Sequence, residues 1–290
     1  MRIGQKEFVT KGHTYVMGIL NVTPDSFSDG GKFNDMDRAL FHVEEMIAEG
    51  MDIVDVGGES TRPGYTLLLP DQEEIERVVP VIEHIKSRFN MPISLDTYKG
   101  AVAEAGIQAG ADLINDIWGL KYDDKLADVI ARAKVPCCLM HNRKEAVYQN
   151  YMEDVLADLK ETLAIAHRAG IPEEGIILDP GVGFGKTYEN NLEIIDRLEL
   201  LNTLGYPVLL GTSRKSVVGL TLDLPASERV EGTLVTTVYG VQKGAMFVRV
   251  HDVKENVRAI KMAEAIRDGY KLHELDKNPA CAKSVHRNED

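Results

Sequence analysis

The sequence predicts an α/β protein with a single domain, folded as a (β/α)8 TIM barrel. The chain has 290 residues, which is close to the usual length of such barrels. About eight short apolar runs, the number that a closed parallel barrel requires, alternate with longer amphipathic stretches and no long linker. An open doubly wound sheet remains the alternative, because alternation alone does not show that the sheet closes.

The apolar runs are typical of strands covered on both faces, since such strands have no polar side to show. In chain order they are "TYVMGIL", "DIVDVG", "PISLD", "DLINDI", "VPCCLM", "GIILDP", "PVLLG" and "AMFVRV". The stretches between them have apolar residues at intervals of three and four, which predicts helices. These helices are expected at 38–49, 72–89, 99–109, 125–133, 153–169, 189–204, 227–241 and 253–266.

The barrel is expected to occupy residues 1–270. The last stretch, 271–290, is polar and irregular and contains Asn278-Pro279, so we expect a loosely held C-terminal tail without a motif.

The charge balance excludes some classes of partner. Lys and Arg total 33 against 46 Asp and Glu, and the net charge of −13 argues against binding to nucleic acid or to an anionic membrane. An anionic ligand therefore needs a local basic cluster. No stretch has the features of a membrane span or a signal peptide, so we expect a cytoplasmic protein.

The three cysteines do not indicate a metal or redox site, because no Cys-x-x-Cys spacing occurs. Cys137 and Cys138 lie together in an apolar run, which indicates packing within a strand. Cys281 lies in the polar tail.

Polar residues stand at the carboxyl ends of the predicted strands, where barrel enzymes place their chemistry. Helix capping or turn formation could explain any one of them, but together they favour a site. In chain order they are Asn21, the segment "GGESTRPG", Asp96, Asn115 with Asp116, Met140 with His141, Asp179, the segment "GTSRKS" and the segment "RVH".

Asp96 and Asp179 are carboxylates within apolar runs, and a buried carboxylate is costly without a partner. We expect both to meet donors in the barrel mouth, as acceptors for a ligand rich in N–H groups. Lys215 would then lie opposite, against a carbonyl or ring nitrogen of that ligand. The plainer alternative is that Asp179 pairs with Lys215 or with an arginine.

Arg62, Arg249 and His251 are candidates for an anion site at the same end. Arg249 and His251 are two residues apart on a strand, so their side chains point the same way. Guanidinium and imidazolium groups suit a diphosphate. The alternative for Arg249 is a structural ion pair with a helix carboxylate.

Taken together, these motifs resemble the dihydropteroate synthase family of pterin-binding enzymes, over almost the whole chain. The segments "GILNVTPDSFSDGGKF", "DIVDVGGESTRPG", "LDPGVGFGKT", "GTSRKS" and "RVHDV" stand in the order expected of the family. The resemblance implies a (β/α)8 barrel that condenses 6-hydroxymethyl-7,8-dihydropterin diphosphate with 4-aminobenzoate, giving 7,8-dihydropteroate and diphosphate. It also implies Mg2+, a homodimer formed through the outer helices, and a target of sulfonamide drugs.

The resemblance implies a role for each matching residue. Asn21, Lys215, Arg249 and His251 would be catalytic. The pterin pocket would consist of Asp96, Asn115, Asp179 and Lys215, lined by Met140, Phe184 and Gly211. The diphosphate site would consist of Asn21, Arg249 and His251, with Asn21 also a ligand of Mg2+. Thr61 and Arg62 would belong to a second mobile loop, and the aminobenzoate would be framed by Phe27, Pro63, Lys215 and Ser216.

By the same resemblance, the loop after Asn21 would order over the diphosphate and exclude water from a cation formed at the pterin methylene. One segment departs from the family pattern: Thr66-Leu67-Leu68-Leu69-Pro70 follows "STRPGY" where a more polar stretch is expected. We expect three exposed leucines there.

Two other functions remain open. A pterin-dependent methyltransferase resembles this barrel and shares the acidic pterin pocket, but it does not need the anion cluster. A non-catalytic pterin-binding paralogue is the second alternative, and analysis of the product by mass spectrometry would distinguish it.

Overall fold

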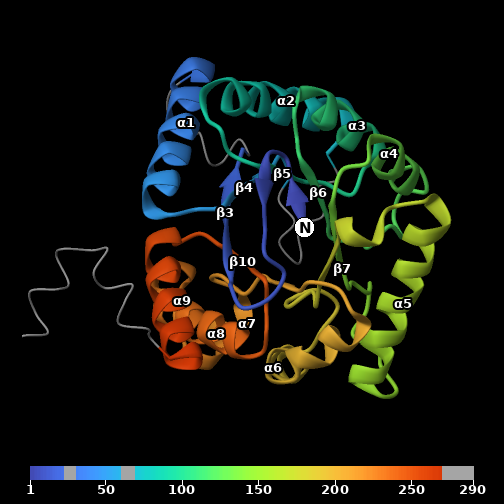
Figure 1. The fold of residues 1–290 in the computed structure, drawn as a ribbon, viewed down its shortest axis with the longest axis vertical. Helices are drawn as coiled ribbons and strands as arrows, with labels where there is room; N and C mark the ends of the chain where they lie inside the picture. Colours follow the sequence, from blue (N-terminus) through green and yellow to red (C-terminus); the bar gives the residue numbers. More distant parts are fainter. Residues whose placement is uncertain (23–30, 60–68, 270–290) are drawn as a thin grey trace, which may run out of the picture.

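A computed structural model describes residues 1–22, 31–59 and 69–269. Helices surround a central set of parallel strands (Figure 1). The central strands are β3 (Tyr15–Asn21), β4 (Ile53–Gly57), β5 (Ile93–Asp96), β6 (Leu113–Asp116), β7 (Cys137–Met140), β8 (Ile176–Asp179), β9 (Leu209–Leu210) and β10 (Phe247–Val250). The α-helices are α1 (Gly31–Glu49), α2 (Asp71–Arg88), α3 (Gly100–Ala109), α4 (Leu126–Ala133), α5 (Tyr151–Ala169), α6 (Tyr188–Asp196), α7 (Ser216–Leu222), α8 (Val230–Gln242) and α9 (Val253–Asp268).

The central strands form one sheet that closes on itself. The eight strands pair in parallel in the order β8-β7-β6-β5-β4-β3-β10-β9. A parallel bridge between Leu178 and Val208, with the Leu178 amide donating to the Pro207 carbonyl at 2.9 Å, joins the two ends of that order. The predicted α/β barrel of a single domain is confirmed, and the open sheet is not what forms.

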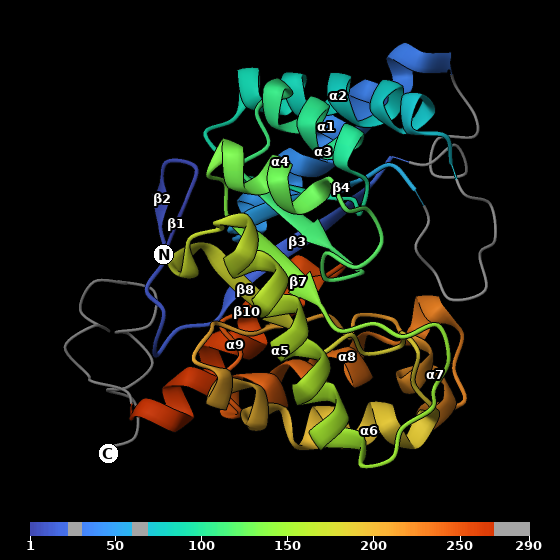
Figure 2. The ribbon, with the colours of Figure 1, turned by 90° about the vertical axis from the view of Figure 1, so that its right-hand side faces the viewer.

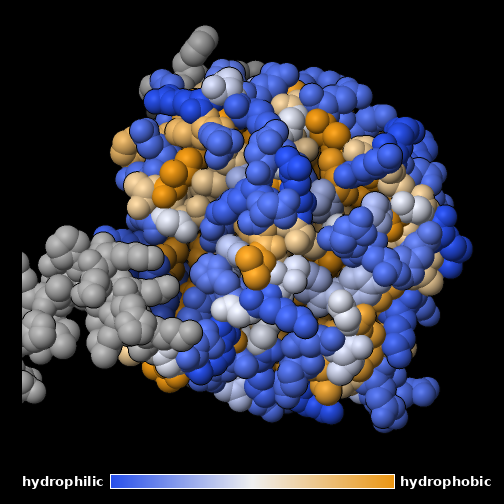
Figure 3. Space-filling view, in the orientation of Figure 1, coloured by the Kyte–Doolittle hydropathy of each residue, from blue (hydrophilic) through white to orange (hydrophobic). Residues whose placement is uncertain are grey.

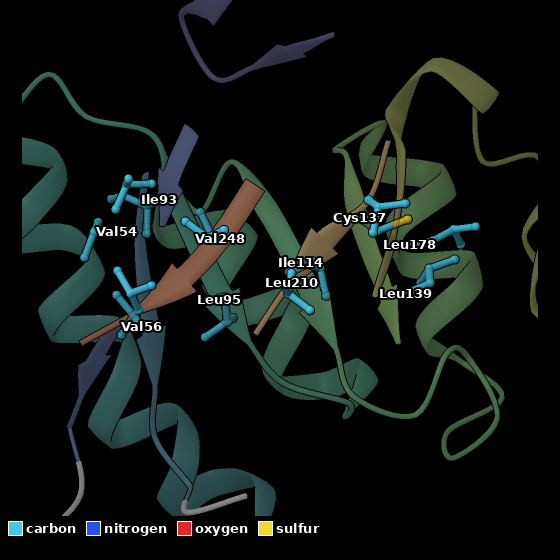
Figure 4. Packing of buried hydrophobic residues seen from close by; sticks show 14 of the residues in the cluster. Val54, Val56, Ile93, Leu95, Ile114, Cys137, Leu139, Leu178, Leu210 and Val248 are labelled. Carbon is cyan, nitrogen blue, oxygen red and sulfur yellow. The ribbon is translucent and has the colours of Figure 1, made fainter. Parts of the chain in front are cut away.

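Alternate residues of each strand face the helices. Because successive side chains of a strand point to opposite faces, one set faces outward and the other faces the barrel axis. The outward set packs with helix residues in one apolar cluster, part of which Figure 4 shows. Its strand members include Val54, Val56, Leu95, Ile114, Cys137, Leu139, Leu178, Leu210 and Val248.

The inward set has two layers of opposite character. Nearer the amino ends of the strands it is apolar and forms a second cluster: Tyr15, Met17, Ile53, Leu113, Cys138, Ile177, Leu209 and Phe247. Further along the strands the inward positions become mostly polar, although Ile19 on β3 is apolar. By this alternation they are Asp55, Asp96, Asn115, Met140, Asp179, Gly211 and Arg249, with Asn21 at the end of β3.

An N-terminal hairpin covers the amino end of the barrel. Strands β1 (Arg2–Ile3) and β2 (Lys6–Glu7) pair in antiparallel fashion, and Figure 2 shows them at one end of the molecule. Ile3 and Phe8 are buried in the inner apolar cluster. The Phe8 ring lies 4.8 Å from that of Tyr15 and 5.6 Å from that of Phe247. The amino end of the barrel is therefore covered by the hairpin.

The predicted helices form, although α1 begins at Gly31 and not at residue 38, and three further differences occur. The stretch 189–204 is divided, because Arg197 leaves the helical region at φ −106° and a 3-10 helix (Leu198–Leu204) follows. The stretch 227–241 begins with a short 3-10 turn (Ala226–Glu228) before α8. Helix α7 was not expected, since its seven residues are too few to show a helical period.

The surface is largely polar, as the 27% of charged residues in the sequence leads one to expect. The face shown in Figure 3 is largely hydrophilic, with apolar residues in small groups. Within the described ranges, no helix has the length and apolar character needed to cross a membrane. The expected tail, 271–290, lies outside the described residues, so its boundary at residue 270 stays a prediction.

Candidate active site

Arg249 lies inside the barrel between two carboxylates. Its Nε donates to Asp55 Oδ2 at 2.6 Å and its Nη2 donates to Asp96 Oδ2 at 2.8 Å. Burial alone would lower the pKa of Arg249, but the two carboxylates outweigh burial and raise this pKa. The alternative expected an ion pair with a helix carboxylate. Arg249 does form ion pairs, but both of its carboxylate partners come from strands. These bonds use two of the five N–H groups of the guanidinium.

Asp96 has one oxygen that accepts nothing in the described chain. Its Oδ1 is buried without a hydrogen-bond partner there, while Oδ2 is held by Arg249. Burial raises the pKa of Asp96 to about 7, an effect that Arg249 opposes and Asp55 strengthens. A buried acceptor without a donor is rare in folded proteins, so Asp96 Oδ1 is suited to an N–H group of a ligand.

Gly57 lies next to both Asn21 and Asp96. A Cβ atom at this glycine would lie 3.7 Å from Asn21 Oδ1 and 3.8 Å from Asp96 Oδ2. Asn21 is exposed at the mouth, whereas Asp96 is buried beneath it. The amide of Asn21 and the carboxylate of Asp96 therefore both line the space next to Gly57.

Asp179 and Lys215 lie on either side of Gly211. A Cβ atom at Gly211 would be 3.7 Å from Lys215 Nζ and 3.8 Å from Asp179 Oδ2. Asp179 Oδ1 accepts from the Gly181 amide at 2.6 Å, and Lys215 Nζ donates to the Val182 carbonyl at 2.6 Å. Burial raises the pKa of Asp179 and lowers that of Lys215 to about 8, and attraction between the two groups opposes both shifts.

The remaining predicted residues in the described chain lie around the same mouth. Lys215 Nζ lies 4.9 Å from the centre of the Phe184 ring. His251 Nδ1 is 3.0 Å from Ser213 Oγ, and the His251 amide donates to the same oxygen at 3.1 Å. Ser216 is exposed at the start of α7. Met140 and Asn115 are buried at the ends of β7 and β6.

Four predicted site residues, Phe27, Thr61, Arg62 and Pro63, lie outside the described residues, as do Leu67 and Leu68. Leu69 is described and is 9% exposed, so the expectation that it is an exposed leucine is wrong. It is buried beside a lysine that binds its backbone.

Lys99 joins the residues on either side of the segment 60–68. Its buried Nζ donates to Glu59 Oε2, to the Leu69 carbonyl and to Glu74 Oε2, each at 2.7 Å. Tyr98 also donates to Glu59 Oε2, at 3.1 Å. An ammonium group has three N–H donors, and all three are used here. Glu59 and Leu69 are therefore fixed relative to the start of α3.

Sequence reasoning missed two residues of this region, Asp55 and Lys186. Asp55 stands in the run "IVDVG" with apolar neighbours, the same signal that singled out Asp96. It is fully buried and also accepts from Ser94 Oγ at 2.5 Å. Lys186 has no such signal, because a lysine in a glycine-rich turn is normally a surface residue.

The described residues contain no group of three or more His, Cys, Asp or Glu side chains that could hold a metal ion. Mg2+ does not require such a group, because it commonly takes one or two protein oxygens and completes its shell with phosphates and water. The exposed amide oxygen of Asn21, near the carboxylate of Asp96, is a suitable ligand of this kind.

The closed barrel and the charged mouth define the class of the protein: an enzyme of the pterin-binding barrels. The sequence model described as "Pterin binding enzyme" matches residues 17–251. A dihydropteroate synthase of Clostridium beijerinckii is 62% identical over 267 residues, which are 92% of this chain and 99% of the relative. The chain belongs to the dihydropteroate synthase family.

Solved structures agree with this assignment. A dihydropteroate synthase of Clostridium difficile, crystallised with pteroic acid, has a TM-score of 0.86 at 48% identity and covers 92% of this chain and 98% of its own. A dihydropteroate synthase of Xanthomonas albilineans with 4-aminobenzoic acid has a TM-score of 0.83 at 40% identity, covering 88% of this chain and 93% of its own.

Proposed function

We propose that this chain condenses 6-hydroxymethyl-7,8-dihydropterin diphosphate with 4-aminobenzoate. The observation that supports this best is the buried Oδ1 of Asp96, which has no hydrogen-bond partner in the described chain and belongs to a carboxylate that Arg249 binds. Lys215 Nζ, Asp179 Oδ2 and the Cβ of Arg249 all lie within 4 Å of the place a Cβ atom would take at Gly211, and the edge of a pterin offers N–H donors together with a carbonyl and ring nitrogens. The guanidinium of Arg249, which donates to Asp96 Oδ2, would supply a cation for the diphosphate.

In this proposal, Asp96, Asn115 and Asp179 accept hydrogen bonds from the N–H groups of the pterin. Lys215 donates to its carbonyl oxygen or ring nitrogen. Met140 and Phe184 would pack against the ring, and Gly211 leaves room for it because a side chain there would lie close to Lys215 Nζ and Asp179 Oδ2. These contacts orient the pterin methylene toward Arg249.

The reaction breaks the bond between the methylene carbon and the diphosphate oxygen, whose electron pair leaves with the diphosphate. Arg249, His251 and Asn21 would bind the departing anion, and Asn21 would hold Mg2+, which when bound neutralises further charge on the phosphate oxygens. The arylamine nitrogen of aminobenzoate then forms the new bond to carbon and loses a proton. Ionisation is helped by the electron-rich dihydropterin ring, so the displacement is dissociative.

The second substrate would be framed by Lys215 and Ser216 together with Phe27 and Pro63, beside Thr61 and Arg62. Ser216 supports this because it is exposed next to Lys215 at the mouth. The roles of the other four residues stay predictions.

A direct test is to incubate the purified protein with both substrates and Mg2+ and to identify the product by mass spectrometry. Formation of 7,8-dihydropteroate and diphosphate is expected, and a sulfonamide should compete with aminobenzoate. Binding of the pterin without product would support the non-catalytic alternative. Transfer of a methyl group from a methylated pterin to a corrinoid, with no dihydropteroate, would support the methyltransferase.

We also propose that the enzyme is a homodimer formed through its outer helices. Large apolar side chains are exposed on three neighbouring helices: Leu192 on α6, Leu220 and Leu222 on α7, and Val235 and Tyr239 on α8. Exposed apolar residues that gather in one region favour association.

The proposal places the enzyme in a reducing cytoplasm, where the buried thiols of Cys137 and Cys138 would stay free.

A further inference from the structure

Two loops at the barrel mouth are in close backbone contact. One follows β7 (residues 141–150) and the other follows β8 (residues 180–187). A Cβ atom at Gly181 would lie 1.9 Å from the His141 carbonyl oxygen, and one at Gly185 would lie 2.2 Å from that of Arg143. Tyr148 also donates from its hydroxyl to the Gly185 carbonyl at 2.6 Å. The two loops therefore act as one unit.

A buried chain of polar groups runs through this contact. Lys186 Nζ lies 2.8 Å from His141 Nδ1, and His141 Nε2 lies 2.9 Å from Asp158 Oδ2. A charged lysine has N–H donors and no acceptor, so Lys186 donates and Nδ1 of His141 accepts. The imidazole proton then lies on Nε2, which donates to Asp158. Burial lowers the pKa of His141 to about 4, which agrees with a neutral ring. Arg143 holds Asp158 from the other side at 2.6 Å.

The other end of this chain reaches the proposed pterin pocket. Lys186 Nζ also donates to the Phe184 carbonyl at 3.0 Å. Burial lowers the pKa of Lys186 to about 7, and both its charged and its neutral form have the two N–H groups needed for His141 and Phe184. Within the same loop, the Val182 carbonyl accepts a hydrogen bond from Lys215 Nζ, and the Phe184 ring lies against the same ammonium group.

We infer that Lys186 and His141 are positioning residues of the pterin pocket, which hold the loop 180–187 where its Val182 carbonyl and Phe184 ring fix Lys215. They act through Lys215 and touch no reacting atom. This inference rests on the proposed function, because it assigns Lys215 to the pterin. It differs from a purely structural role in that the pocket, and not only the fold, depends on the two side chains.

The first test replaces Lys186 with Met, which keeps the aliphatic chain and removes the donor. The matched control is Lys86→Met, since Lys86 also joins two elements by donating to both oxygens of Asp112, at 2.8 Å, but at the amino end of the barrel. Calorimetry with 6-hydroxymethylpterin should give about tenfold weaker binding for Lys186→Met and an unchanged affinity for Lys86→Met. Because Lys215 would also frame the aminobenzoate, the KM for that substrate should rise in Lys186→Met and stay within twofold of the wild type in Lys86→Met.

Lys186→Arg keeps donors and should recover part of the affinity. Equal affinities in the wild type and Lys186→Met would overturn the inference, and so would equal losses in Lys186→Met and Lys86→Met. If the wild type itself binds no pterin, the proposed function fails instead.

The second test measures the tautomer and the protonation state of the His141 imidazole directly. With ¹⁵N-labelled histidine and His141→Gln as the assignment control, NMR should show an unprotonated Nδ1 and a protonated Nε2 from pH 6 to 8. An Nδ1–H tautomer, or a ring that titrates within this range, would contradict the chain of hydrogen bonds on which the inference rests.

Discussion

Asp96, Asp116 and Asp179 all stand at the ends of buried strands, yet their oxygens are used differently. Asp116 accepts from the amides of Trp118 at 2.8 Å and Leu120 at 2.6 Å, so each of its oxygens is bound by the turn that follows β6. Asp96 keeps Oδ1 without a donor in the described chain, and Asp179 uses Oδ1 for a single amide. Asp116 is therefore a turn residue, whereas the other two have an oxygen available for a ligand.

This contrast gives a matched pair of variants. Asp179→Asn replaces a charged acceptor by a group that can present a donor, and a hydrogen bond to a charged group is worth about 1.5–3 kcal/mol. Pterin affinity should fall roughly tenfold to hundredfold. Asp116→Asn should leave that affinity unchanged but lower the melting temperature, because its amide nitrogen would face a backbone N–H. Calorimetry and thermal unfolding check both, and unchanged affinity in Asp179→Asn would remove Asp179 from the site.

The pKa of Asp96 predicts how pterin binding depends on pH. Burial raises this pKa to about 7, and only the carboxylate accepts N–H groups with both oxygens. Between pH 8 and pH 6 the ionised fraction falls, so affinity should decrease by about tenfold. Lys215 gains a proton over part of the same range, and Asp96→Asn separates the two effects because it should remove the decrease. A wild-type affinity that stays constant from pH 8 to pH 6 would contradict this assignment.

The same raised pKa makes the stability of the folded protein depend on pH in the opposite direction. In the folded protein Asp96 binds its proton more tightly than in the unfolded chain, where its pKa is near 3.8. Its contribution to folding is complete below that value and is lost as the pH rises through about 7. Ligand binding and folding therefore favour opposite protonation states of one carboxylate.

At the scale of single elements, the strands explain which residues could be predicted. The runs "PISLD" and "GIILDP" place Asp96 and Asp179 at strand ends, and strand periodicity then turns both toward the axis, as the structure has them. Asp55 follows the same rule but lies within its run, so strand-end reasoning passed over it. Helix α7 and the Lys186–His141 contact could not be predicted, because a short helix has no clear period and the contact joins residues 45 positions apart.

Arg249 connects three strands, and its replacement tests both stability and the leaving-group site. Arg249→Ala would leave Asp55 and Asp96 as buried carboxylates without their cation, a change that typically costs about 3–5 kcal/mol. Arg249→Lys keeps a charge but loses the two-sided geometry of the guanidinium.

We expect Arg249→Lys to fold and to lose affinity for the pterin diphosphate at least tenfold more than for the unphosphorylated pterin. Melting temperature and both affinities are measured on one preparation. Equal losses for the two ligands would mean that Arg249 serves only the ion pairs with Asp55 and Asp96.

At the scale of the whole molecule, the net charge of −13 leaves few places where two copies could meet without repulsion. The apolar side chains on α6, α7 and α8 offer such a place. Val235→Glu puts a charge in this region, where the side chain is 67% exposed, and should convert the dimer to a monomer in sedimentation velocity. Met262→Glu on α9, at 61% exposure, is the matched control and should leave the dimer intact. A monomeric wild type would refute the proposed assembly.

The N-terminal hairpin has a consequence for how the chain is made. Phe8 leaves the ribosome long before Phe247, the ring against which it packs, because Phe247 belongs to β10, the last of the central strands described. During synthesis the hairpin must therefore wait, with its apolar side chains unburied, until nearly the whole barrel has emerged. Contacts between distant parts of a chain form slowly, and apolar segments exposed meanwhile are prone to aggregation. The hairpin is thus the part of the nascent barrel that waits longest for its partner, and the arrival of β10 ends that period.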